Sequence, residues 1–177
     1  MIHFIFPFIK RIKKTKTDCL EYLHVKYLKA KGLEIGTNSR IFAPSDLIMG
    51  LNEVKIGNNT RIGKGAWIKA EGGLIIGNNV RISRNLTCYT CNHDYSGKEL
   101  PYDENLIYRP VRIEDNVWIG MNVTILPGAH IEEGAIIGAG SVIRKKVERC
   151  SIVGAGLAET IGSRDLSHYD RIAKKSK

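Results

Sequence analysis

Aromatic residues are scarce in this sequence: phenylalanine, tryptophan and tyrosine make up 7% of its 177 residues. Long hydrophobic runs are missing as well. The apolar stretch over residues 2–9 contains His3 and Pro7 and falls well short of the ~20 residues that span a bilayer. Its basic cluster follows the apolar stretch, whereas in a signal peptide it would precede it. We therefore expect neither a membrane span nor a secretory signal.

Cysteine is also scarce. Four cysteines, Cys19, Cys88, Cys91 and Cys150, in a chain of this size favour reduced thiols over a disulfide framework. We accordingly expect a cytoplasmic protein. Cys88 and Cys91 precede His93, but no second pair of ligands follows them, so we expect no metal site.

The excess of positive charge lies at the two ends. The chain has 27 Lys and Arg against 18 Asp and Glu, but between residues 32 and 163 the two signs balance. A nucleic-acid groove would place its charge on the fold itself, so no nucleic-acid partner is expected. Residues 2–14 combine bulky apolar groups with lysine and arginine, which suits peripheral contact with an anionic membrane at its inner face, and subunit packing and disorder are the alternatives for this segment.

Aliphatic residues recur at every sixth position. The longest run is Ile113, Ile119, Ile125, Ile131, Ile137 and Ile143, and shorter runs begin at Ile35, Ile56 and Ile76. A period of six does not fit the 3.6-residue period of an α-helix. It does fit a short strand with one inward aliphatic side chain, followed by a turn that glycine and asparagine adopt easily.

Three hexads close one triangular coil, and stacking such coils places isoleucine above isoleucine. The sequence predicts an all-β parallel β-helix of about five coils, over residues 35–52, 56–75, 76–93, 113–130 and 131–148. A β-sandwich gives no reason for the sixfold register. We assign residues 33–160 to this domain, 1–32 to a basic, amphipathic helical segment and 161–177 to a basic tail.

A short helix is predicted before the first coil. Leu20, Leu23, Tyr27 and Leu28 fall on one helical face, and Gly32 ends the helix. We expect this apolar face to pack against the bottom of the prism, where it would cover an open β edge.

The hexads resemble the left-handed parallel β-helix of the hexapeptide-repeat acyltransferases over residues 33–157. The left-handed coil is implied by this resemblance, because the repeat itself does not fix handedness. Members of that family are trimers whose active sites are shared between subunits. The resemblance therefore also implies a homotrimer.

One long break interrupts the repeat, over residues 94–112. An excursion of that length in so regular a scaffold is usually functional, and we expect a protruding loop that covers a site. His93 stands at its base. Histidine is suited to take a proton from a hydroxyl nucleophile, although a lone histidine is more often structural.

The resemblance gives His93 a role. Galactoside, maltose and related O-acetyltransferases of this family place a catalytic histidine just before the protruding loop and a Trp-Ile-Gly hexad after it. This sequence has both, as His93 and as Trp118-Ile119-Gly120. The resemblance implies that His93 is the general base, which deprotonates the acceptor hydroxyl for direct attack on the acetyl-CoA thioester.

Residues next to His93 are candidates for contact with the acceptor. Asn92 precedes it, and Tyr95 could stack on a sugar ring. Asp94 could orient His93, but successive strand residues point in opposite directions, so Asp94 also suits a turn at the start of the loop.

The resemblance implies acetyl-CoA as the co-substrate and no metal. Trp118 is expected to pack against the pantetheine arm, and Gly138 and Ala139 lie in the segment whose backbone contacts this arm. Arg144 and Lys145, in a basic cluster over residues 144–149, are expected to meet the phosphates.

Together these features imply an acetyl-CoA-dependent O-acetyltransferase that acts on a saccharide, in a surface polysaccharide or glycan precursor. Acetylation of a streptogramin-type antibiotic and a non-catalytic structural trimer remain alternatives. The hexapeptide-repeat carbonic anhydrases need three histidines on adjacent coils, whereas only His93 and His130 fall in the predicted prism.

Overall fold

The computed structural model describes residues 19–42 and 47–156. The predictions for residues 2–14 and for the tail over residues 161–177 lie outside the described residues.

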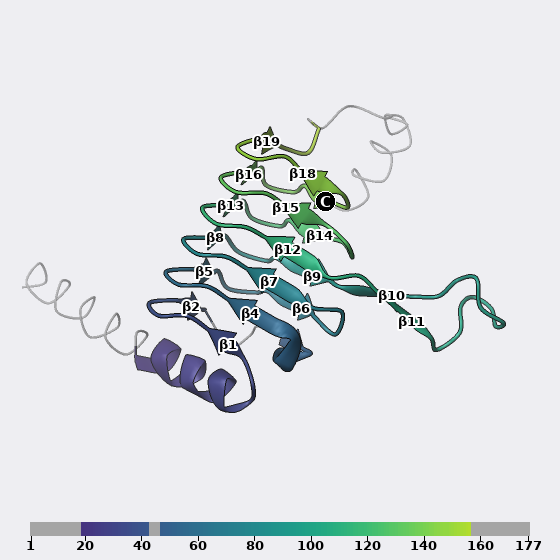
Figure 1. The fold of residues 1–177 in the computed structure, drawn as a ribbon, viewed down its shortest axis with the longest axis horizontal. Coiled ribbons are helices and arrows are strands. Elements are labelled where there is room, and N and C mark those ends of the chain that lie inside the picture. Colours follow the sequence, from purple (N-terminus) through teal and green to yellow (C-terminus); the bar gives the residue numbers. More distant parts are fainter. Residues whose placement is uncertain (1–18, 43–46, 157–177) are drawn as a thin grey trace, which may run out of the picture.

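The fold is a triangular prism of three parallel sheets (Figure 1). The first sheet contains β1 (Glu34–Ile35), β4 (Val54–Ile56), β7 (Leu74–Ile76), β12 (Val111–Ile113), β15 (His130–Ile131) and β18 (Lys146–Val147). The second contains β2 (Arg40–Ile41), β5 (Arg61–Ile62), β8 (Arg81–Ile82), β13 (Trp118–Ile119), β16 (Ile136–Ile137) and β19 (Ile152–Val153). The third contains β3 (Leu47–Met49), β6 (Trp67–Lys69), β9 (Thr87–Tyr89), β14 (Thr124–Ile125) and β17 (Val142–Ile143).

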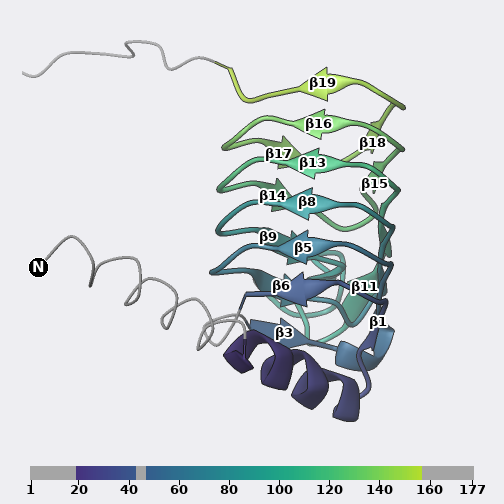
Figure 2. The ribbon, with the colours of Figure 1, turned by 90° about the vertical axis from the view of Figure 1, so that its left-hand side faces the viewer.

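Successive strands belong to successive sheets, so the chain winds around the prism. The described residues form five complete coils and two sides of a sixth, which confirms the predicted solenoid and extends it by a partial turn. In Figure 2 the second sheet faces the viewer with its strands running leftward, the chain returns behind it, and the coils climb from bottom to top. The coil is therefore left-handed, as the family resemblance implied.

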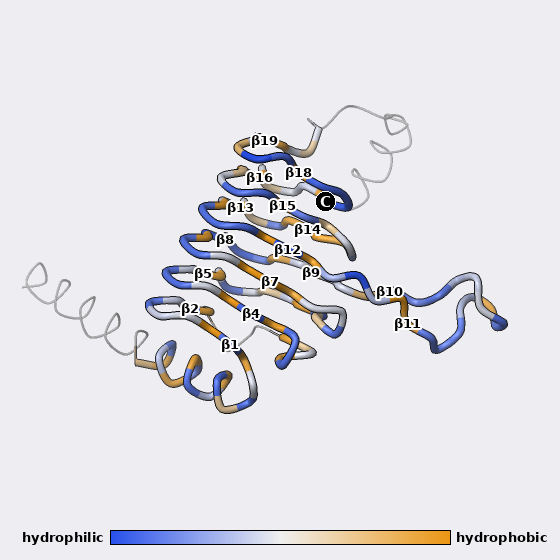
Figure 3. Tube along the Cα trace, in the orientation of Figure 1, coloured by the Kyte–Doolittle hydropathy of each residue, from blue (hydrophilic) through white to orange (hydrophobic). Residues whose placement is uncertain are grey.

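Inward isoleucines form the core. In the second sheet Ile62, Ile82, Ile119 and Ile137 stack in register, one from each of four successive coils. Each of them is almost completely buried, and Figure 3 shows the same alternation of apolar and polar segments on every coil. In the third sheet Cys88 takes the place of an isoleucine between Ile68 and Ile125. The sixfold register thus predicts the core column by column.

Asparagines line one corner of the prism in a ladder. Asn38, Asn59, Asn79 and Asn116 occupy equivalent turns with φ between 53° and 61°, in the left-handed region. Asparagine tolerates this region better than most residues. Their side-chain amides are hydrogen-bonded from coil to coil, at 3.1, 2.7 and 3.2 Å. The ladder satisfies these polar groups and fixes the spacing of the turns.

Residues 19–30 are helical and lie at the first coil (Figures 1 and 2). The helix packs through Leu28, which is 6% exposed, while Leu20, Leu23 and Tyr27 are more than half exposed. The predicted packing face is therefore wrong for three of its four residues. The helix is rotated because its other side carries the contacts: Val25 packs against the core and Glu21 forms an ion pair with Arg40 at 3.6 Å.

The excursion after the third coil is a β-hairpin rather than an irregular loop. β10 (Cys91–His93) pairs antiparallel with β11 (Leu106–Tyr108), and the hairpin projects sideways from the prism (Figure 1). At its base the Arg109 amide donates to the Thr90 carbonyl at 2.8 Å, and β12 resumes the coil beside β7. The hairpin consequently leaves the register of the prism unchanged.

Candidate active site

His93 ends β10, where the hairpin leaves the prism. Its ring stacks on the Tyr102 ring with centroids 4.0 Å apart and an angle of 24° between the planes. The Nδ1 atom is buried without a hydrogen-bond partner among the described residues. Nε2 is therefore the nitrogen that an incoming group can reach, and a hydroxyl placed there would have a proton acceptor.

A cavity of about 290 Å³ opens beside His93. It is lined by Asn92, His93, Tyr95, Ile107, Arg109, Leu126, Pro127 and Arg144. The structure thus brings together four of the residues that the sequence singled out, namely Asn92, His93, Tyr95 and Arg144. The cavity spans three coils, because the hairpin comes from the third, Leu126 and Pro127 from the fourth and Arg144 from the fifth.

Asp94 is not among the residues that line this cavity. Its carboxylate accepts hydrogen bonds from the amide and the hydroxyl of Ser96, at 2.9 and 2.6 Å. These bonds lower the pKa of Asp94. The side chain therefore stabilises the turn that follows β10, and a contact between Asp94 and the acceptor stays a prediction.

Trp118, Gly138 and Ala139 lie elsewhere on the prism. Trp118 points outward from the second sheet, is 58% exposed and pairs with Ile136. Gly138 and Ala139 follow β16 at the next corner, where a Cβ on Gly120 would lie 2.6 Å from the Ala139 amide nitrogen. A side chain at Gly120 would therefore collide with the backbone of the next coil. None of the three lines the His93 cavity.

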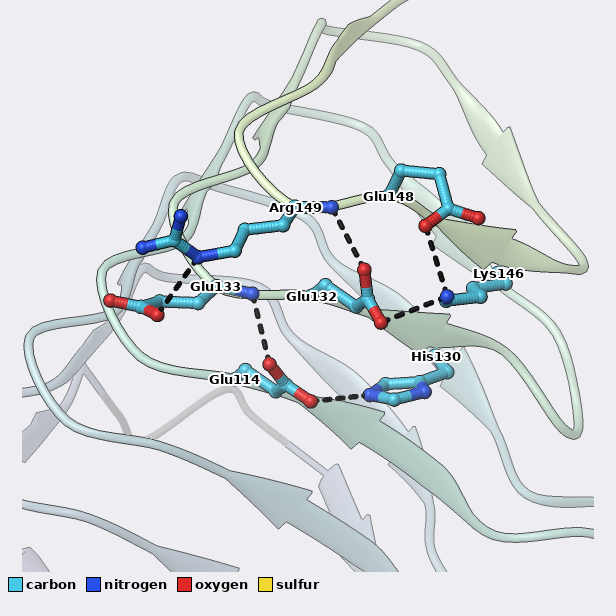
Figure 4. A network of polar contacts seen from close by, with 7 residues as sticks. All are labelled: Glu114, His130, Glu132, Glu133, Lys146, Glu148 and Arg149. Carbon is cyan, nitrogen blue, oxygen red and sulfur yellow. Dashed lines mark hydrogen bonds and ion pairs between the residues drawn. The ribbon is translucent and has the colours of Figure 1, made fainter.

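Two of the four cations in the basic cluster over residues 144–149 form ion pairs with glutamates (Figure 4). Lys146 forms ion pairs with Glu132 and Glu148, both at 2.9 Å, and Arg149 pairs with Glu133 at 3.2 Å. The interaction with Lys146 lowers the pKa of Glu132. Arg144 and Lys145 form no ion pair with any described residue, and so they are the members of the cluster available to an anion.

His130 and Cys91 have polar partners, and Cys88 is buried in the core. His130 Nε2 lies 2.7 Å from Glu114 Oε1, and Figure 4 shows this pair within the same network as Lys146. Burial raises the pKa of Cys88 to about 12. The Cys91 thiol donates to the Glu71 carboxylate at 3.4 Å. Across the described residues, no three His, Cys, Asp or Glu side chains gather as metal ligands, and no helix there is long and apolar enough to cross a membrane.

Sequence analysis missed Arg109, Ile107, Leu126 and Pro127 as residues of the cavity. Arg109 and Ile107 fall in the break of the repeat, where no register indicates the direction of a side chain. One signal was available: Leu126-Pro127 interrupts the usual polar start of a hexad.

Comparison with known proteins places this architecture in a family. A model described as bacterial transferase hexapeptide (six repeats) matches residues 110–145, and one described as hexapeptide repeat of succinyl-transferase matches residues 53–88. The galactoside O-acetyltransferase of Escherichia coli is 32% identical over 139 residues, which cover 76% of this chain and 67% of that protein. The chain therefore belongs to the hexapeptide-repeat transferase family.

Two further relatives agree with this assignment. The galactoside O-acetyltransferase of Lactococcus lactis is 31% identical, over 70% of this chain and 59% of that protein. The solved structure of a hexapeptide-repeat acetyltransferase from Vibrio cholerae is similar with a TM-score of 0.64 and 25% identity, covering 82% of both chains. The chain covers 35% of a relative from Schizosaccharomyces pombe, so it spans between about a third and two thirds of the curated relatives named here.

Proposed function

We propose that this protein is an acetyl-CoA-dependent O-acetyltransferase whose acceptor is a saccharide and whose general base is His93. The observation that carries the proposal is the cavity beside the hairpin, where Nδ1 of His93 is buried and Nε2 is left for a ligand. Two relatives named galactoside O-acetyltransferases support the reaction and the class of acceptor.

In the proposed reaction the acceptor hydroxyl binds in the cavity within hydrogen-bonding distance of Nε2. His93 removes the hydroxyl proton as the oxygen attacks the thioester carbonyl of acetyl-CoA. Collapse of the tetrahedral intermediate breaks the carbon–sulfur bond, and the imidazolium returns its proton to the departing thiolate. The products are the acetyl ester and coenzyme A, and no acyl-enzyme is required.

The surface formed by Trp118, Gly138 and Ala139, which we call the donor surface, supports a further part of the proposal: a homotrimer whose active sites are shared between subunits. His93 projects on the hairpin, whereas Trp118 and Ala139 lie on the second sheet and at its far corner. A donor bound along Trp118 would meet the His93 of a neighbouring copy if subunits pack side by side. Each site would then combine the hairpin of one subunit with the prism of another.

Thiol release from acetyl-CoA tests the reaction against a panel of hexoses, nucleotide sugars and streptogramin-type antibiotics. We expect turnover with a saccharide, and His93→Ala should lower kcat by about 10²-fold or more because it removes the base. His130→Ala is the matched control: it removes a histidine of the prism that lies outside the cavity, so activity should be retained.

The same samples separate the alternatives. Turnover of an antibiotic alone would favour that acceptor class over saccharides. Absence of acetyl-CoA binding by calorimetry would favour a structural protein without catalysis. Retained turnover in His93→Ala would refute the assignment of the base.

Co-expression of two inactive variants tests the shared site. His93→Ala lacks the base, and Ala139→Trp places a bulky group on the exposed donor surface. In mixed trimers about a quarter of the sites would combine an intact hairpin with an intact donor surface, so about a quarter of wild-type activity should return. If each site lies within one chain, the mixture stays inactive.

A further inference from the structure

The His93 cavity is positively charged. Two arginines, Arg109 and Arg144, line it, and none of its described lining residues is an aspartate or a glutamate. Asp94, the acidic residue next to His93 in the sequence, is already engaged by the amide and the hydroxyl of Ser96. Neither arginine forms an ion pair with any residue that the structure describes. An uncompensated pair of guanidinium groups in a ligand cavity favours an anionic ligand.

Arg109 is held in place by its backbone on both sides. Its amide donates to the Thr90 carbonyl at 2.8 Å, and its carbonyl accepts from the Gly128 amide at 3.2 Å. Its aliphatic stem lies beside Gly128, where a Cβ would be in van der Waals contact with the Arg109 Cδ atom at 3.5 Å. Gly128 itself has a φ of +83°, which glycine adopts without strain. The hydrogen bonds thus fix the backbone of Arg109 beside the cavity, and its side chain is exposed to an incoming ligand.

Arg144 reaches the cavity from the coil above. It follows Ile143, whose carbonyl accepts from the Leu126 amide at 2.8 Å, and Leu126 also lines the cavity. The sequence suggested Arg144 as a contact for the phosphates of coenzyme A. The thioester must lie beside His93, however, and the whole pantetheine arm separates the thioester from those phosphates. An extended donor therefore cannot place its pyrophosphate in the cavity that its thioester occupies.

We propose that the acceptor carries a carboxylate or a phosphate, which Arg109 and Arg144 bind while its hydroxyl faces His93. This inference rests on the proposed function, because it names the class of acceptor for the same site. A guanidinium donates two parallel hydrogen bonds to either group, so carboxylate and phosphate share the recognition chemistry. The cavity is at the small end of the ~300–1,000 Å³ typical of ligand pockets, which suits one acidic sugar ring.

Three hexoses that differ at one carbon test the proposal: glucose, glucuronate and glucose 6-phosphate. Calorimetric titration into the wild-type protein should show at least one of the two anions binding 10-fold or more tightly than glucose. Comparison of the two anions identifies the preferred group. In Arg109→Gln and in Arg144→Gln the preference for an anion over glucose should disappear. Arg112→Gln is the matched control, because Arg112 lies in β12 outside the cavity, and this variant should prefer the anion over glucose as strongly as the wild type does.

The possible outcomes distinguish a failure of the anionic acceptor from a failure of the proposed reaction. If neither anion binds more tightly than glucose, or if the arginine variants weaken acetyl-CoA binding and leave the preference unchanged, the anionic acceptor is refuted. Thiol release with neutral sugars would also overturn it while the acetyltransferase assignment stands. Arginine-dependent binding of an anion without thiol release would support the anion site and count against the reaction.

Discussion

Replacement of Asn79 provides a quantitative test of the asparagine ladder. Asn79 has a φ of 56°, and its side chain accepts a hydrogen bond from Asn59 at 2.7 Å and donates one to Asn116 at 3.2 Å. Asn79→Ala removes both bonds, each worth about 0.5–1 kcal/mol at an exposed site. It also places alanine in the left-handed region, at a cost of about 1–2 kcal/mol. The expected loss in the free energy of unfolding is therefore about 2–4 kcal/mol.

Asn79→Gly separates the two contributions. Glycine adopts the left-handed region freely, so this variant should lose mainly the two hydrogen bonds and be more stable than Asn79→Ala. The assay is equilibrium unfolding in urea followed by circular dichroism, at one fixed protein concentration because association would shift the midpoint. If the alanine variant were as stable as the glycine variant, the left-handed turn would not be what selects asparagine here.

Further predictions concern the core. Ile119→Ala should destabilise the protein by about 2–5 kcal/mol because it leaves a cavity at a fully buried position. In the same urea assay the control Ile152→Ala, at a site that is 77% exposed, should cost less than about 1 kcal/mol. Burial raises the pKa of Cys88 from 9.0 to about 12. At pH 8.5 iodoacetamide should therefore modify the exposed Cys150 and leave Cys88 unmodified until the protein unfolds, and peptide mass spectrometry measures both. The pKa of Cys88 is higher in the folded than in the unfolded protein, so the contribution of Cys88 to stability is present below pH 9 and is lost as the pH rises toward 12. If the wild type lost no more stability at high pH than Cys88→Val, this reasoning would be contradicted.

The prism is predictable because its code is local and repeated. Three hexads of six residues separate Ile119 from Ile137, so the spacing alone places Ile137 one coil above Ile119 without any knowledge of distant contacts. The helix before the prism has no such code. Its sequence shows an apolar face with Leu20 and Leu23, but the side that packs is decided by partners elsewhere in the chain, such as Arg40.

The candidate site was only partly predictable for the same reason. His93 could be found because it ends a hexad at the start of the break. Arg109 could not, because its position depends on hydrogen bonds to Thr90 and Gly128, two residues on different coils. Sequence spacing also could not show that Asp94 is engaged by Ser96, since a carboxylate after a strand suits a ligand and a turn equally well.

The sequence of the hairpin can change without changing the prism. Its two ends meet at Thr90 and Arg109, and the coils before and after it stack as though the intervening residues were absent. Insertions, deletions or wholesale exchange between residues 94 and 105 would therefore leave the isoleucine columns intact. Changes in this segment can reshape the walls around His93 at little risk to folding, so proteins with similar prisms are free to differ in the ligand that binds there.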